Sequence, residues 1–281
     1  MMGNPIKHSK SPLIHKEFAH LSDQDITYSA MLVPEDGFAD AVTEFFAEGG
    51  KGLNVTVPFK QQAYELADEL SDRAQRAGAV NTLICLTDGR IRGDNTDGVG
   101  MMRDIANNHD GRVTNKRVLV VGAGGAVRGV LAPLLQENPA SVVIANRTLE
   151  KAQVLADQFS DMGRIEAYAF EDLAGDPFDW IINGTSASLS GDVPPLPECV
   201  VGEYSRCYDM MYSADETPFN LWAQNLGAAA TYDGLGMLVE QAAESFRLWC
   251  GLLPLTCRVT VSYKHLTVPT KRESESMVSA R

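Results

Sequence analysis

Cysteine, histidine and positive charge are all scarce in this sequence of 281 residues. The five cysteines are scattered without a Cys-x-x-Cys pair, and the five histidines show no metal-ligand spacing with them, so neither a disulfide framework nor a metal site is indicated. The 24 basic residues face 37 acidic ones, and the formal net charge of −13 argues against nucleic acid or an anionic membrane as a partner. Without a membrane-length apolar run or a signal peptide, a reducing cytoplasm is the expected compartment.

The sequence does have the composition of a globular protein, with 44% hydrophobic and 22% charged residues. Its length allows two domains of ordinary size or one large domain. Short apolar segments alternate with helical patterns along most of the chain, so we expect an α/β fold with parallel sheets and right-handed crossovers throughout.

A strand-turn-helix pattern at residues 117–135 is the strongest single signal. Residues 118–121 form an unbroken apolar run, as in a strand buried on both faces, and the small residues 122–126 follow at once. Such a turn brings backbone N–H groups and a helix N-terminus against an anion, and a side chain at Gly124 would block a pyrophosphate. Val127 stands where the dinucleotide-binding pattern usually has a small residue. We predict a dinucleotide site here.

The next strand, residues 141–145, ends where a dinucleotide enzyme reads the adenosine ribose. NAD enzymes usually carry an acidic residue there, whereas this chain has Arg147, with Lys151 one turn further on. An arginine suits a 2′-phosphate, so we predict NADP. The alternative is that Arg147 is a solvated charge after a strand.

Polar side chains cluster in the first third of the chain. In the predicted strand at 52–57, the period of two places Asn54 and Thr56 on one face, at the lip of a cleft. Pro58 ends that strand and places Lys60 in the first turn of a helix, where the helix dipole disfavours a cation. A lysine at such a position needs some compensation, which makes Lys60 a candidate functional residue; the alternative is an exposed lysine.

Further candidates stand at turns. Asn81 ends the small-residue turn 78–82, and Asp97 lies in the polar stretch 93–98 that opens a helix. Asp97 could act only as a helix cap, and Ser11 is an equally good N-cap or substrate contact for the predicted helix that starts around Pro12. We expect strands at 27–33, 83–86, 165–170, 179–183 and 206–211, and helices at 37–47, 63–74, 99–105, 151–159 and 237–249. Gln241 and Ser245 share one face of the last helix.

Read together, these stretches resemble the shikimate dehydrogenase family. The matching segments are 3–12, 54–60, 78–82, 93–98, 122–126, 146–148 and 233–242, in one order over residues 3 to 255. The resemblance implies an N-terminal α/β substrate domain, residues 1–96, to which the C-terminal helix 234–256 returns. It also implies a Rossmann-type NADP domain at 97–233, with the cleft between the two domains.

The resemblance also implies the site residues. The catalytic pair is Lys60 and Asp97, and the substrate contacts are Ser9, Ser11, Asn54, Thr56, Asn81, Tyr212 and Gln241. The NADP contacts are Gly122, Ala123, Gly124, Gly125, Ala126, Asn146, Arg147, Thr148, Lys151, Met210 and Gly234. No metal is implied.

The implied reaction is the reversible reduction of 3-dehydroshikimate to shikimate by NADPH. Lys60 would stabilise the charge that develops on the carbonyl oxygen and supply the proton, while Asp97 keeps its ammonium charged. A quinate/shikimate dehydrogenase, or a non-catalytic NADP-sensing protein on the same scaffold, are the alternatives. A binding module would have no need of Lys60 and Asp97 together. The partner is a small molecule, and a homodimer is the assembly to test.

Both ends of the chain depart from the family pattern. The family has a strand before the turn at residues 3–5, and this sequence begins without one. Residues 257–281 show no helical period and little apolar area, so we expect them to be a disordered or non-native tail. We also expect that removing 258–281 changes stability little, whereas adding an apolar strand before Met2 raises it.

Overall fold

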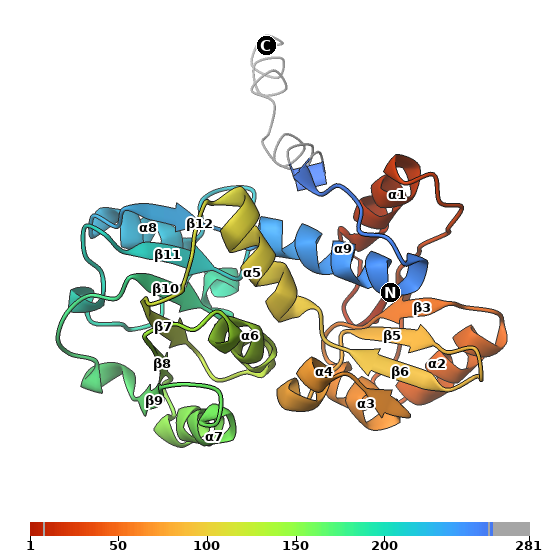
Figure 1. Ribbon diagram of the computed structural model, residues 1–281, viewed down its shortest axis with the longest axis horizontal. Coiled ribbons are helices and arrows are strands. Elements are labelled where there is room, and N and C mark those ends of the chain that lie inside the picture. The colour runs from red at the N-terminus through yellow and green to blue at the C-terminus, as the bar shows by residue number, and fades with distance from the viewer. Residues whose placement is uncertain (8, 258, 261–281) are drawn as a thin grey trace, which may run out of the picture.

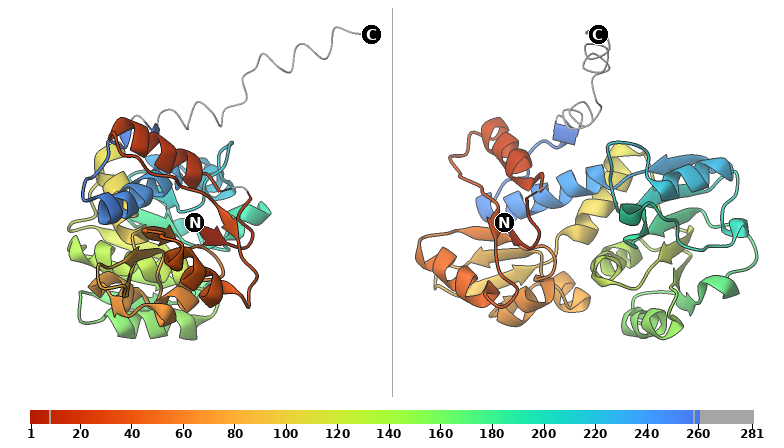
Figure 2. Two further views of the ribbon diagram at one scale, coloured as in Figure 1. Left: turned by 90° about the vertical axis from the view of Figure 1, so that its right-hand side faces the viewer. Right: turned by 180° about the vertical axis from the view of Figure 1, so that it is seen from behind.

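The computed structural model describes residues 1–7, 9–257, 259 and 260. They form two lobes that are joined by two helices, α5 (Asp97–Asn108) and α9 (Leu235–Cys250), which pack along each other at the junction (Figure 1). The view from behind shows the same pair between the lobes (Figure 2). The first lobe is built mainly from residues before α5, and the second from residues between α5 and α9.

The second lobe contains a six-stranded sheet in the order β12-β11-β10-β7-β8-β9. Every neighbouring pair in it is parallel, as expected for a Rossmann-type sheet. Alternate residues of β7 belong to different buried clusters, Val118 and Val120 on one face and Leu119 and Val121 on the other, so helices and loops cover both faces. The strands are β7 (Arg117–Val121), β8 (Ser141–Ala145), β9 (Ile165–Tyr168), β10 (Trp180–Asn183), β11 (Arg206–Asp209) and β12 (Ala230–Tyr232).

The helices of this lobe follow their strands. They are α6 (Gly125–Gln136), α7 (Leu149–Phe159) and α8 (Pro218–Asn225), with short 3₁₀ turns η1 (Phe170–Asp172), η2 (Ala187–Ser190) and η3 (Glu198–Val200). After β7, the strands β8 and β9 are added on one side of it, and the later strand β10 pairs with its other side. The carboxyl ends of β7 and β10 therefore form the switch point at which such sheets bind ligands.

The first lobe departs from the prediction of parallel sheets throughout. Its sheet has the order β3-β5-β6-β4, and β5 is antiparallel to both neighbours. For β5 and β6 the reason is the short turn around Asp88 and Gly89, which joins them directly, because such a hairpin allows only antiparallel pairing. Its strands are β3 (Gly52–Asn54), β4 (Glu69–Leu70), β5 (Thr82–Cys85) and β6 (Ile91–Asp94), and its helices α2 (Phe38–Ala47), α3 (Lys60–Leu66) and α4 (Asp72–Ala77).

At the N-terminus, the expectation that no strand precedes the turn is wrong. Residues Met2–Gly3 form β1, which pairs in parallel with β2 (Met31–Leu32), and Met2 also bridges to Val55. Met2 is fully buried, and its carbonyl accepts from the Thr56 N–H at 3.1 Å. The predicted strand at 27–33 is reduced to the two residues of β2, because only Met31 and Leu32 pair with β1.

Helix boundaries correct three further predictions. In the first helix, α1 (Ser11–Leu21), Lys10 stands at the N-cap position without a side-chain cap hydrogen bond, so Ser11 is not the N-cap but the first helical residue. Thr96 likewise precedes α5, and Asp97 is the first helical residue. The predicted helix at 63–74 is split into α3 and α4, because α3 ends at Leu66 and β4, which lies between them, pairs with β6. The placement of Lys60 in a first helical turn is confirmed.

The tail prediction does not hold at its start. Cys257, Val259 and Thr260 are helical, and Val259 is fully buried in a cluster with Ile14, Phe18 and Val239, side chains of α1 and α9. The rest of the predicted tail, 261–281, lies outside the described residues.

Candidate active site

An ion pair stands where the two lobes meet. Lys60, the first residue of α3, places its Nζ 2.6 Å from Oδ2 of Asp97, the first residue of α5. The lysine side chain is 27% exposed and the aspartate side chain 12%, so the pair is largely removed from water without being sealed. A charged ammonium held by one carboxylate oxygen can still donate to a ligand from its other hydrogens.

Asn81 orients the carboxylate of that pair. Its Nδ2 donates to Asp97 Oδ1 at 2.8 Å, so both carboxylate oxygens are engaged. Its own Oδ1 accepts from the Thr96 backbone N–H at 2.9 Å and from the Thr82 hydroxyl at 2.8 Å. The start of β5 and the start of α5 are thereby held together, which fixes the position of the Asp97 carboxylate beside Lys60.

A cavity of about 180 Å³ opens in front of this pair. Among the residues predicted as substrate or catalytic contacts, eight line it: Ser11, Asn54, Thr56, Lys60, Asn81, Asp97, Tyr212 and Gln241. Two predicted cofactor contacts, Met210 and Gly234, line it as well. The cavity thus contains polar residues from the first lobe and residues that follow β11 and open α9, so the fold brings together segments that are far apart in the sequence.

Ser9 does not line the cavity. Its hydroxyl donates to Met1 Sδ at 3.0 Å and accepts from the Ser11 backbone N–H at 3.3 Å. Four lining residues were not predicted, Met1, Val55, Met237 and Leu238. Leu238 lies one turn before Gln241 on α9, so its helical spacing from a predicted residue was an available signal. Burial raises the pKa of the Tyr212 phenol, which therefore stays protonated at neutral pH.

The predicted nucleotide turn lies at the carboxyl end of β7, at the switch point of the sheet. Gly122 has φ +106°, a left-handed backbone that favours glycine, and a Cβ there would meet Thr185 and Gly184 after β10. A Cβ at Gly124 or Gly125 would meet nothing within 4 Å, so the space before the turn is open. Residues 122–126 lead directly into α6, whose first N–H groups are free of intrahelical acceptors. This cradle fits a pyrophosphate.

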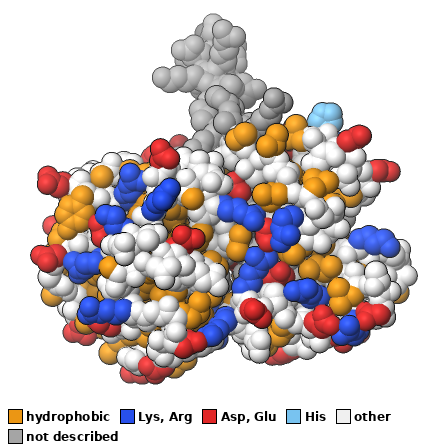
Figure 3. Space-filling view, viewed as in Figure 1, with side chains coloured by type: hydrophobic (Ala, Val, Ile, Leu, Met, Phe, Trp, Pro, Cys, Tyr) orange, Lys and Arg blue, Asp and Glu red, His pale blue; other side chains and the backbone are white. Residues whose placement is uncertain are grey.

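The second nucleotide segment follows β8. Asn146 Nδ2 donates to the Thr148 carbonyl at 2.8 Å and shapes the turn into α7, while Arg147 and Lys151 are both exposed. Two exposed cations at this edge fit the 2′-phosphate of NADP. Figure 3 shows further Lys and Arg side chains along the junction of the lobes, on the face seen in Figure 1.

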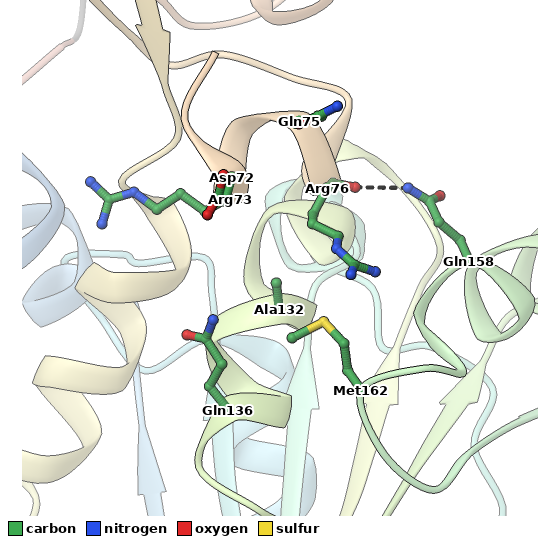
Figure 4. A pocket seen from close by; sticks show the side chains of 8 residues that line it. All are labelled: Asp72, Arg73, Gln75, Arg76, Ala132, Gln136, Gln158 and Met162. Atoms are coloured by element: carbon green, nitrogen blue, oxygen red, sulfur yellow. Dashed lines mark hydrogen bonds between the residues drawn. The ribbon is translucent and has the colours of Figure 1, made fainter.

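A larger cavity lies elsewhere. About 560 Å³ in volume, it opens between α4 and the helices α6 and α7, and none of the predicted site residues lines it (Figure 4). Its two arginines are already paired, Arg73 with Asp94 at 2.6 Å and Arg76 with Asp161 at 2.6 Å. Gln158 also donates to the Arg76 carbonyl at 2.7 Å (Figure 4). Both arginines that line this cavity are therefore already engaged by carboxylates.

Two features are absent from residues 1–7, 9–257, 259 and 260, namely a metal-binding cluster and a membrane-spanning helix. No group of three or more His, Cys, Asp or Glu side chains in them could hold a metal ion. None of the helices there has both the length and the apolar character to cross a membrane.

Family models match three parts of the chain. The shikimate dehydrogenase substrate binding domain matches residues 1–83. The shikimate / quinate 5-dehydrogenase model matches residues 104–190, and the shikimate 5′-dehydrogenase C-terminal domain matches residues 234–255.

Whole proteins match as well. Shikimate dehydrogenase (NADP(+)) of Cellvibrio japonicus is 58% identical over 254 residues, which cover 90% of this chain and 92% of that protein. The crystal structure of an Ael1 enzyme from Pseudomonas putida superposes with a TM-score of 0.89 at 48% identity, over 93% of this chain and 96% of that one. Shikimate 5-dehydrogenase from Thermus thermophilus was solved in complex with NADP(H) and shikimate. It superposes with a TM-score of 0.84 at 30% identity, over 95% of this chain and 98% of that one.

Proposed function

The chain belongs to the shikimate dehydrogenase family, and we propose that the cavity around Lys60 and Asp97 is its active site. It is an NADP-dependent oxidoreductase that interconverts shikimate and 3-dehydroshikimate. The observation that carries the site assignment is the 2.6 Å contact between Lys60 Nζ and Asp97 Oδ2 in a cavity shared by both lobes. A non-catalytic sensor would not need this pair.

Lys60 acts as the acid of the reduction and as the base of the reverse reaction. Bound NADPH supplies the hydride that the carbonyl carbon receives. The Lys60 ammonium stabilises the negative charge that develops on the oxygen and gives it a proton. Asp97 accepts from Lys60 and holds it in place, and Asn81 fixes Asp97 in turn. In the opposite direction, Lys60 removes the proton of the substrate hydroxyl.

The hydroxyl and carboxylate groups of the substrate explain why so many small polar side chains surround the pair. Each buried hydroxyl needs a partner, because an unpaired polar group costs free energy and weakens the selection of the correct ligand. We assign substrate binding to Ser11, Asn54, Thr56, Asn81, Tyr212 and Gln241, which line the cavity. Ser9, whose hydroxyl accepts from the Ser11 N–H, is assigned to the same group as a residue at its edge.

NADP binding is assigned to the second lobe. The turn 122–126 and the α6 N-terminus would hold the pyrophosphate, and Asn146, Arg147, Thr148 and Lys151 the adenosine phosphate. Met210 and Gly234 contribute to the cavity from this side, which supports a place for them near the nicotinamide. We accordingly propose a substrate domain of residues 1–96 with the returning segment 234–256, and an NADP domain of residues 97–233.

The compartment of the protein, the class of its partners and its assembly are further proposals. Five cysteine thiols without a disulfide support a reducing cytoplasm, and the net charge of −13 supports small molecules rather than nucleic acid or membrane as partners. A homodimer is the assembly we propose to test, by light scattering on the purified chain.

The direct experiment is a steady-state assay of the purified enzyme with each combination of two substrates and two cofactors. Shikimate with NADP⁺ should give the highest kcat/KM, because Arg147 favours NADP and the polar cavity favours the polyol acid. Replacing shikimate with quinate, or NADP⁺ with NAD⁺, should lower kcat/KM. Equal turnover of quinate would favour the quinate/shikimate paralogue, and absence of turnover with every combination would contradict the proposed site.

A further inference from the structure

Asn54 is held from two sides. It lies at the end of β3, it is almost fully buried, and it lines the cavity. On one side its Nδ2 faces the Asn81 carbonyl at 3.2 Å and Ser245 Oγ at 2.9 Å. On the other side its Oδ1 accepts from the Tyr28 hydroxyl at 2.7 Å.

The chemistry of these neighbours fixes which end of the amide faces which partner. The Asn81 carbonyl can only accept, so the Nδ2 end must face it. Ser245 donates its hydroxyl to the Gln241 carbonyl at 3.2 Å, which leaves an oxygen lone pair for Asn54. The Oδ1 end therefore faces Tyr28, and an amide oxygen has a second lone pair with which it can accept from another donor.

Tyr28 is itself held by its surroundings. It lies in the irregular segment between α1 and β2, and its ring stacks on His15 with centroids 4.1 Å apart and planes 9° apart. Trp249 packs against both rings, at 6.1 Å from Tyr28 and 5.4 Å from His15. Burial lowers the pKa of His15 to about 3, so the stack is neutral. Burial also raises the pKa of the Tyr28 phenol well above its ordinary value, and the hydroxyl stays a donor.

We propose that Tyr28 is a positioning residue for substrate binding, which acts through Asn54. By occupying one lone pair of Asn54 Oδ1, its hydroxyl directs the other lone pair into the cavity, where it accepts from a hydroxyl of the substrate. Tyr28 stands behind Asn54 and is not part of the lining of the cavity. The inference rests on the proposed function, since it assumes that Asn54 binds the substrate.

The first test is Tyr28→Phe, which keeps the stacked ring and removes only the hydroxyl. We expect the KM for shikimate to rise about three- to tenfold, as for the loss of one neutral hydrogen bond. The kcat should stay within about twofold and the KM for NADP⁺ should not change, because Lys60 and the nucleotide turn are untouched. Tyr204→Phe is the matched control: it also loses one hydroxyl contact, to the Pro177 carbonyl in the second lobe, and should leave every constant unchanged.

The second test combines this change with Asn54→Ala. If Tyr28 acts through Asn54, the double variant should have the same KM for shikimate as Asn54→Ala alone. An unchanged KM in Tyr28→Phe, or an equal rise in both backgrounds, would overturn the inference while the assignment of Asn54 stands. An Asn54→Ala enzyme with a normal KM would overturn the assignment of Asn54 and the inference with it.

Ligand-dependent melting gives a readout that does not need the Asn54 variant to fold. Shikimate should raise the Tm of Tyr28→Phe less than that of the wild type, whereas NADP⁺ should raise both equally. Equal shifts with shikimate would count against the positioning role.

Discussion

Replacing Glu244 with glutamine should destabilise the protein at neutral pH and much less in acid. Glu244 lies on α9, and its side chain is only 2% exposed. It accepts from Arg73 of α4 at 3.0 Å, from Arg103 of α5 at 2.8 Å and from Arg247 on its own helix at 2.8 Å. This carboxylate therefore joins the helix that carries Gln241 to both neighbouring helices.

The size of the effect follows from the pKa of Glu244. Burial opposes its ionisation, but the hydrogen bonds and charges of Arg247, Arg103 and Arg73 outweigh burial and lower the pKa from 4.5 to about 2. That difference corresponds to about 3 kcal/mol in favour of the charged form. Because the Arg247 side chain is 42% exposed and water screens part of the interaction, we expect a loss of about 2 kcal/mol at pH 7 in Glu244→Gln.

The sign of the pH dependence is set by the direction of the shift. The folded protein holds Glu244 at a lower pKa than the unfolded chain, so the stabilisation is complete above about pH 4.5 and is lost as the pH falls toward 2. The difference in unfolding free energy between wild type and Glu244→Gln should therefore fall to about 1 kcal/mol at pH 3. Urea unfolding followed by tryptophan fluorescence at the two pH values measures it.

A surface glutamate provides the control. Glu166 pairs with Arg164 at 3.0 Å, but the two side chains are 41% and 71% exposed. Glu166→Gln should change stability far less than Glu244→Gln at both pH values. The reasoning is refuted if Glu244→Gln is as stable as wild type at pH 7, or if its deficit grows as the pH falls.

Two other variants test the nucleotide lobe and the junction. Arg147→Ala should bind NADPH about 10- to 100-fold more weakly in a fluorescence titration, because it loses a charge-assisted contact. Its affinity for NADH should not change. An unchanged preference for NADPH would instead assign the 2′-phosphate contact to Lys151. Arg76→Ala should lower the Tm by less than about 3 °C in a calorimetric scan, because its pair with Asp161 is 41% and 57% exposed; a much larger drop would show that this contact holds the lobes together.

The sequence predicted the parts of the fold that local patterns determine. The apolar run at 118–121 and the small residues after it predicted β7 and its turn, and Pro58 correctly placed Lys60 in the first turn of a helix. Boundaries and pairing were less predictable, because partners decide them. The strand expected at 27–33 keeps two residues, since β1 pairs with only Met31 and Leu32. Ser11 had the chemistry of an N-cap, but the helix begins at Ser11 itself and Lys10 precedes it.

Contacts between distant residues were beyond the sequence argument. Tyr28 meets Asn54 from 26 positions away, and Ser245 meets it from 191 positions away, with no motif that connects them. The four unpredicted cavity residues include Met1 and Met237, which a local pattern does not distinguish from ordinary core residues. A resemblance over most of the chain supplied the candidate site residues, and the packing of the fold supplied the contacts behind them.

The most direct test of the proposed mechanism compares two lysine variants that each break a lysine–aspartate pair. Lys60→Ala breaks the pair with Asp97 in the cavity, and Lys116→Ala breaks the pair with Asp179, at 3.1 Å on the surface of the second lobe. The account predicts that Lys60→Ala lowers kcat for shikimate oxidation about 100-fold or more with NADP binding intact, and that Lys116→Ala retains wild-type turnover. Near-normal turnover by Lys60→Ala would contradict it.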